Sequence, residues 1–145
     1  MAHVTTIDSP TVHGILAERK DGSITLALPG TDYRLLLIAD TAPGSAIANA
    51  ELNKPIAGTI HARAKRVDIT TTGGRFIEPV FGRPRRLQGR IIATDPGQNA
   101  ITIFCGAPVV CTLMPTQKAE QFEVGQLVGF DVEKGSHFES GGADH

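Results

Sequence analysis

Basic side chains are concentrated in the middle of this 145-residue sequence, between residues 63 and 90. The eight are Arg63, Lys65, Arg66, Arg75, Arg83, Arg85, Arg86 and Arg90. This basic band also holds two acidic residues, so its formal charge is +6, whereas residues 1–62 carry −2 and residues 91–145 carry −5. Seven of the eight are arginines, whose planar guanidinium groups bind phosphate or carboxylate through two parallel hydrogen bonds. The band therefore indicates a site for an anionic ligand.

Two aromatic residues, Phe76 and Phe81, lie within the basic band. Small β-barrels bind single-stranded nucleic acid by combining a basic groove with aromatic rings that stack on the bases. The alternative is structural: the arginines would form ion pairs with the acidic flanks of the same chain or of a neighbouring subunit. The sequence favours the structural interpretation and leaves ligand binding open.

Other chemistry has little support in the sequence. The five histidines lack H-x-H or H-x₃-H spacing, although His13 and His61 fall on strands that a barrel could bring together. Cys105 and Cys111 follow apolar residues and have no histidine beside them, so we expect buried free thiols rather than metal ligands. Nucleophile-elbow and phosphate-loop motifs are absent. We therefore expect no enzymatic activity, no metal and no cofactor.

The elements that must position the basic band recur along the chain. Residues 12–17 resemble residues 87–93, residues 24–26 match 101–103, and residues 55–59 match 126–130. Turn sequences at 20–22 and 95–97 follow the first match in each copy. Three matches in the same order predict two copies of one β-rich unit.

Each copy predicts three strands, a short helix and two more strands. In the first copy the strands are 12–19, 23–28, 33–39, 56–62 and 65–71, and the helix is 45–52, between an N-cap at Ser45 and a left-handed stop at Asn53. In the second the strands are 86–94, 99–104, 108–114, 126–133 and 136–139. Its helix, 117–123, would be opened by Thr116 and stopped by Gly125.

This order predicts an all-β fold of two tandem OB-like or TOBE-like small β-barrels, each with one short helix. The alternative is a single β-sandwich. The predicted organisation is a first barrel at 1–72, a linker with an extended arm at 73–85, a second barrel at 86–139 and a disordered tail at 140–145. Pro79 lacks an N–H group, so the arm at 75–81 is predicted to be an edge strand or a docked segment.

The second copy resembles the TOBE domain, the small barrel of molybdate-binding (Mop) proteins and of some transporter ATPases. The resemblance rests on residues 87–91, with Gly89 in the first strand, and on residues 124–133, which begin Val-Gly-Gln-Leu-Val. It implies a small-barrel fold and oxyanion binding between barrels. The family's Ser-Ala-Arg-Asn anion-binding stretch is replaced here by Gly82-Arg83-Pro84-Arg85.

The overall expectation is a non-enzymatic binding or assembly module in the cytoplasm. No apolar run is long enough to span a bilayer, and residues 1–6 do not resemble a signal peptide. The leading hypothesis is a homo-oligomer, in which the basic band meets an acidic flank of a second copy and the arm adds a strand to a neighbour. The alternative is binding of single-stranded nucleic acid or a small oxyanion such as molybdate along residues 63–90.

Overall fold

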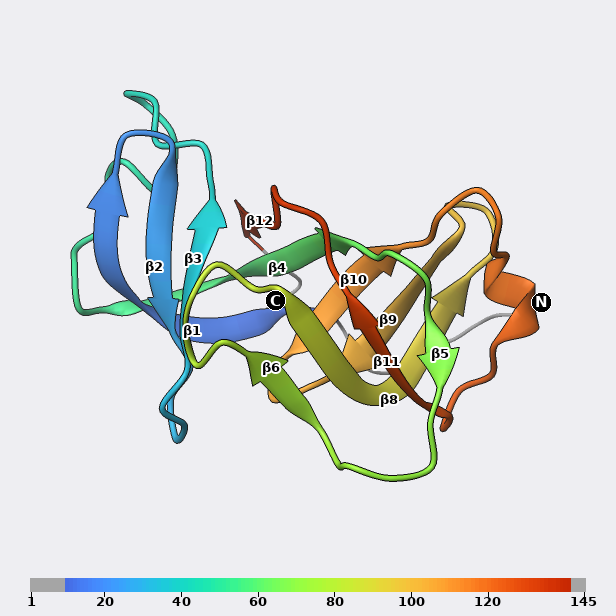
Figure 1. The fold of residues 1–145 in the computed structure, drawn as a ribbon. Coiled ribbons are helices and arrows are strands. Elements are labelled where there is room, and N and C mark those ends of the chain that lie inside the picture. The colour runs from blue at the N-terminus through green and yellow to red at the C-terminus, as the bar shows by residue number, and fades with distance from the viewer. Residues whose placement is uncertain (1–9, 142–145) are drawn as a thin grey trace.

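The computed structural model describes residues 10–141, and within them the chain is all-β (Figure 1). The strands of the first half are β1 (Val12–Lys20), β2 (Ser23–Ala27), β3 (Arg34–Ile38), β4 (Pro55–Arg63) and β5 (Asp68–Ile69). Two short strands, β6 (Phe76–Glu78) and β7 (Phe81–Gly82), follow in the middle of the chain. The remaining strands are β8 (Arg86–Asp95), β9 (Ala100–Phe104), β10 (Pro108–Thr112), β11 (Leu127–Asp131) and β12 (His137–Ser140).

Five strands close into a small mixed barrel. Their order is β1–β2–β3–β12–β4, and β4 pairs again with β1 to complete the ring. All neighbours are antiparallel except β3 and β12, which run parallel and pair through Ile38 and His137. Closure leaves few unpaired backbone groups at sheet edges. The sequence prediction of a small β-barrel is therefore confirmed for one barrel, which takes its fifth strand from the C-terminal end of the described chain.

The long strand β4 joins this barrel to the rest of the sheet. Its residues 55–58 pair with β1, and its residues 60–63 run parallel to β10. From β10 the sheet continues through β9, β8 and β11 to β5. The second predicted barrel is not shown as a closed ring of strands. After β4, strand pairing with β11 and the residue that follows it is limited to one isolated bridge, Ala64 to Val132, and to the two residues of β5.

The first two sequence matches hold equivalent places in the two halves, whereas the third is displaced by one residue, because Gly14 pairs with Ile56 and the equivalent Gly89 pairs with Val128. Strands β1 and β2 pair Leu16 with Leu26, and a β-bulge follows in β1. Strands β8 and β9 pair Ile91 with Ile103, and a bulge follows at the same step in β8. The repeat in the sequence thus corresponds to a repeat in strand register.

The first predicted helix was wrong, because residues 43–49 form turns. The hydroxyl of Ser45 accepts a hydrogen bond from the Ala48 N–H (3.1 Å), which caps a single turn. The Arg19 guanidinium then donates to the carbonyls of Ile47 and Ala50 (3.1 and 2.7 Å), where a longer helix would receive its own N–H groups. The predicted helix is also short, so few residues would add hydrogen bonds to offset the free-energy cost of forming its first turn.

The second predicted helix, 117–123, was also wrong: it is reduced to a three-residue 3-10 helix, η1 (Ala119–Gln121), and no α-helix occurs in residues 10–141. It starts after Lys118 rather than Thr116. The Gln117 side chain is bonded to both backbone groups of Val67, which fixes the chain just before η1. Asn53 has the predicted left-handed backbone, with φ of 65°, and Gly125 also has a positive φ, 99°, but neither residue ends an α-helix.

One apolar core runs through both halves of the described chain and includes Leu16, Ile60 and Phe130. Cys105 and Cys111 are buried free thiols, as predicted. Burial raises the pKa of Cys105 to about 12, so this thiol stays protonated at neutral pH. The described residues include no helix long and apolar enough to cross a membrane.

Candidate functional site

Three arginines of the basic band form ion pairs within the chain. The pairs are Arg63–Glu133 (3.9 Å), Arg66–Asp68 (3.1 Å) and Arg86–Asp131 (3.1 Å). Two of them reach the acidic C-terminal flank, as the structural interpretation of the band proposed. All six side chains are at least 41% exposed, so each pair contributes little to stability.

Other members of the band surround a cavity of about 410 Å³, which we call the basic cavity. Its basic side chains are Lys65, Arg83, Arg85, Arg86 and Lys134, and its acidic ones are Glu78, Asp131 and Glu133, which leaves a formal charge of +2. Among residues 10–141, Lys65, Arg83, Arg85 and Lys134 have no ion-pair partner. Their charges are therefore available to a ligand.

The backbone around the basic cavity is held by hydrogen bonds between segments that are distant in sequence. The N–H of Lys65 donates to the carbonyl of Asp131, and the N–H of Arg85 donates to the carbonyl of Glu78, both at 2.8 Å. The N–H of Val132 donates to the carbonyl of Arg85 (2.9 Å). These bonds fix where the basic side chains begin, even though most of the side chains are solvent-exposed.

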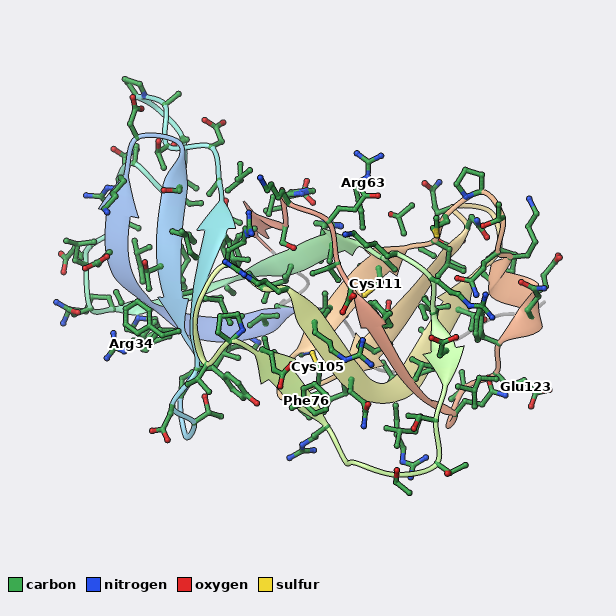
Figure 2. The ribbon with its side chains drawn as sticks, viewed as in Figure 1. Arg34, Arg63, Phe76, Cys105, Cys111 and Glu123 are labelled. Carbon is green, nitrogen blue, oxygen red and sulfur yellow. The ribbon has the colours of Figure 1, made fainter. Side chains whose placement is uncertain are left out.

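The rest of the predicted site does not line this cavity. The Arg75 guanidinium lies over the Phe104 ring, 5.0 Å from its centre, and Arg90 donates to the carbonyl of Gly125 (2.8 Å). Phe76 is half-buried on β6, on a different part of the molecule from Arg63 (Figure 2). Phe81 is 67% exposed on β7, where it pairs with Arg34 of β3. The band is thus divided, and neither phenylalanine is a wall of the basic cavity.

Lys134 belongs to the basic cavity and was missed from the sequence. It is one of two lysines in the acidic C-terminal flank, outside the basic band. The bridge between Ala64 and Val132, with the hydrogen bond from the Lys65 N–H to the Asp131 carbonyl, brings it near Lys65, and a pairing between residues so far apart has no local signal.

A histidine pair forms a second cluster, which the sequence did not indicate. The rings of His61 on β4 and His137 on β12 are stacked, with centroids 4.7 Å apart and planes 14° from parallel. The Nε2 atom of His61 lies 3.2 Å from Oε1 of Glu139. Asp40 and Ser45 line the same cavity, whose volume is about 530 Å³. Across residues 10–141, no group of three or more potential ligands has a geometry that could hold a metal ion.

The comparisons identify no family for this chain. No protein-family description matches it, and no curated protein is significantly similar to it. The fold shows a small five-stranded mixed β-barrel with additional strands outside it, which is the part of the TOBE resemblance that the structure supports.

Proposed function

We propose that this protein is a non-enzymatic binding module that holds an anionic ligand in the basic cavity. The observation that carries the proposal is the set of unpaired charges. Lys65, Arg83, Arg85 and Lys134 line one cavity and lack acidic partners among the described residues. Like charges held close together repel one another, and an anion that bridges them removes this repulsion.

A small oxyanion fits this cavity better than a nucleic acid strand. Strand binding uses aromatic rings on which successive bases stack, and the cavity is lined by none. Its acidic side chains, Glu78, Asp131 and Glu133, would also repel a continuous phosphate backbone. The planar guanidinium group of an arginine can donate two parallel hydrogen bonds to two oxygen atoms of phosphate, sulfate or molybdate.

The test is a thermal-shift titration of the full chain with phosphate, sulfate, molybdate and tungstate, and with short single-stranded DNA and RNA, at low and high salt. We expect a saturable rise in melting temperature with an oxyanion, because a ligand that binds only the folded state stabilises it by RT ln(1 + [L]/Kd). A shift with oligonucleotides alone, falling steeply with salt, would replace the oxyanion by single-stranded nucleic acid.

The matched variants are Arg83→Gln with Arg85→Gln, and Arg34→Gln as control. Arg34 is an exposed arginine on β3 and does not line the basic cavity. We expect the double variant to lose about a hundredfold or more in anion affinity, since two charge-assisted bonds are removed and each is worth about 1.5–3 kcal/mol. Equal losses in both variants would show nonspecific attraction and overturn the proposed site.

Self-assembly is a second candidate function, and one observation favours it. Leu36 and Ile38 on β3 are 41% and 53% exposed, and Val80 and Phe81 beside them are 50% and 67% exposed. The arm at 75–81 pairs with β8 and β3 of its own chain, so this surface, rather than a donated strand, would carry the contact. We expect a homo-oligomer by light scattering, and Phe81→Ser to reduce its mass to that of a monomer. A monomeric wild-type chain at high micromolar concentration would exclude this candidate.

A further inference from the structure

Strand β12 closes the barrel mainly through its pairing with β4, because it meets its other neighbour, β3, at one residue only. It has four residues, which pair with β4 from His137 opposite His61 to Ser140 opposite Gly58, and it meets β3 at His137 alone. Phe138 anchors it, because this ring is 2% exposed and fills the space beside Gly58 where any other residue would place a Cβ atom. The closure of the barrel therefore depends on one buried ring and the pairs on either side of it.

Titratable groups surround the outer face of this closure. The stacked His61 and His137 rings lie across the β4–β12 pair, and Glu139 of β12 is within 3.2 Å of His61. Asp40, just after β3, lines the same cavity, and Asp95, at the end of β8, lines a second cavity that also contains His61. The residues that β10 contributes next to His61, Val110 and Thr112, are uncharged.

The charge of this cluster changes between pH 7 and pH 5, because an unperturbed histidine has a pKa of about 6.5. Two neutral imidazole rings stack favourably, and one added proton is stabilised by the Glu139 carboxylate. A second proton places two positive rings with their centres 4.7 Å apart. Burial and the neighbouring His61 lower the pKa of His137, in the direction that this repulsion requires.

We propose that the His61–His137 pair is a pH-sensitive latch on the barrel, in which protonation of the second ring weakens the pairing of β12 with β4. The direction of the pH effect on stability follows from the difference in proton binding between the folded and unfolded states. A histidine whose pKa is lowered by folding binds fewer protons in the folded state than in the unfolded state. Its contribution to stability is complete above about pH 6.5 and is lost as the pH falls below that value. Asp40 and Glu139 oppose the effect while they stay ionised.

The other half of the molecule contains a structurally equivalent pair of residues with which the His61–His137 pair can be compared. The bridge of Ala64 to Val132 corresponds to the pair of Phe138 and Ile60, and the residues next to it are Arg63 and Glu133. These two side chains carry opposite charges and form an ion pair, with 3.9 Å between Nε of Arg63 and Oε1 of Glu133. The equivalent position on β4 and β12 holds two histidines, which repel each other when both are protonated.

The test combines histidine titration by NMR with amide hydrogen exchange of the full chain at pH 7 and pH 5, corrected for intrinsic exchange. We expect His137 to titrate below an ordinary histidine, and amides of residues 137–141 to exchange about tenfold faster at pH 5, while β9 amides do not change. His61→Gln should raise the pKa of His137 and abolish most of the acid-induced exchange. His137→Phe keeps a stackable ring without a titratable group and should also abolish it.

His13→Gln is the matched control, because His13 is an exposed histidine on β1 that also lies in a strand paired with β4. It should leave the acid-induced exchange unchanged. An unchanged response in His61→Gln and His137→Phe would overturn the latch, as would protection of β12 that is equal at the two pH values. This test does not depend on the ligand of the basic cavity.

Discussion

The two halves of the molecule make the same join in different ways. In the first half, β12 lies along β4 for four residues, with Phe138 opposite Ile60. In the second, the chain after β4 lies along β11 through the single bridge of Ala64 to Val132, and pairing resumes only at β5. The register is equivalent, but one join closes a barrel and the other does not.

The side chain at the centre of each join explains much of this difference. Phe138 and Ala64 are both 2% exposed, but a phenylalanine buries far more apolar surface than an alanine. The chain beside Ala64 therefore has less to hold it as a strand, and Lys65 and Arg66 are exposed there. Consequently the tight join completes the barrel, and the loose join borders the basic cavity. Equivalent positions in the two halves thus differ: one completes the barrel, and the other borders the cavity to which we assign the proposed ligand.

The largest expected effect that tests this comparison is the truncation of Phe138. We expect Phe138→Ala to lower the free energy of unfolding by about 3–5 kcal/mol, because it removes a buried ring and leaves a cavity beside Gly58. Val132→Ala, at the loose join, should cost about 1–2 kcal/mol. Urea unfolding followed by circular dichroism measures both values. Equal losses would contradict the distinction between a tight and a loose join.

Much of the local structure could be predicted from the sequence. The predicted positions of the strands hold to within a few residues, and the turns at Asn53 and Gly125 hold because their backbone requirements are local. The two helices were wrong because distant side chains, Arg19 and Asn99, bond to backbone groups on which each helix would depend. Such bonds join residues 18 to 31 positions apart and have no local pattern.

The candidate sites show the same limit. Lys65, Arg83, Arg85 and Arg86 were predicted from their concentration in the sequence, and the structure brings them to one cavity. Lys134 and the stacking of His137 on His61 were missed, because both depend on which strand pairs with which copy of the repeat. A sequence repeat shows that two units are alike. It does not show that a strand following the second unit will complete the first.

A smaller effect is expected from one acidic residue at the rim of the basic cavity. Glu133→Gln raises the formal charge of this cavity from +2, and it also frees Arg63, whose Nε atom lies 3.9 Å from Glu133. We expect the affinity for phosphate or molybdate to rise about two- to fivefold at low salt and to change little at high salt, because exposed charges are screened over a Debye length of about 10 Å at 0.1 M. Calorimetric titration at two salt concentrations measures the change.

Glu51→Gln is the control, since Glu51 is exposed and lies outside the cavity. If both variants gained the same affinity, net charge rather than the basic cavity would govern binding, and the assignment of ligand binding to the loose join would fail.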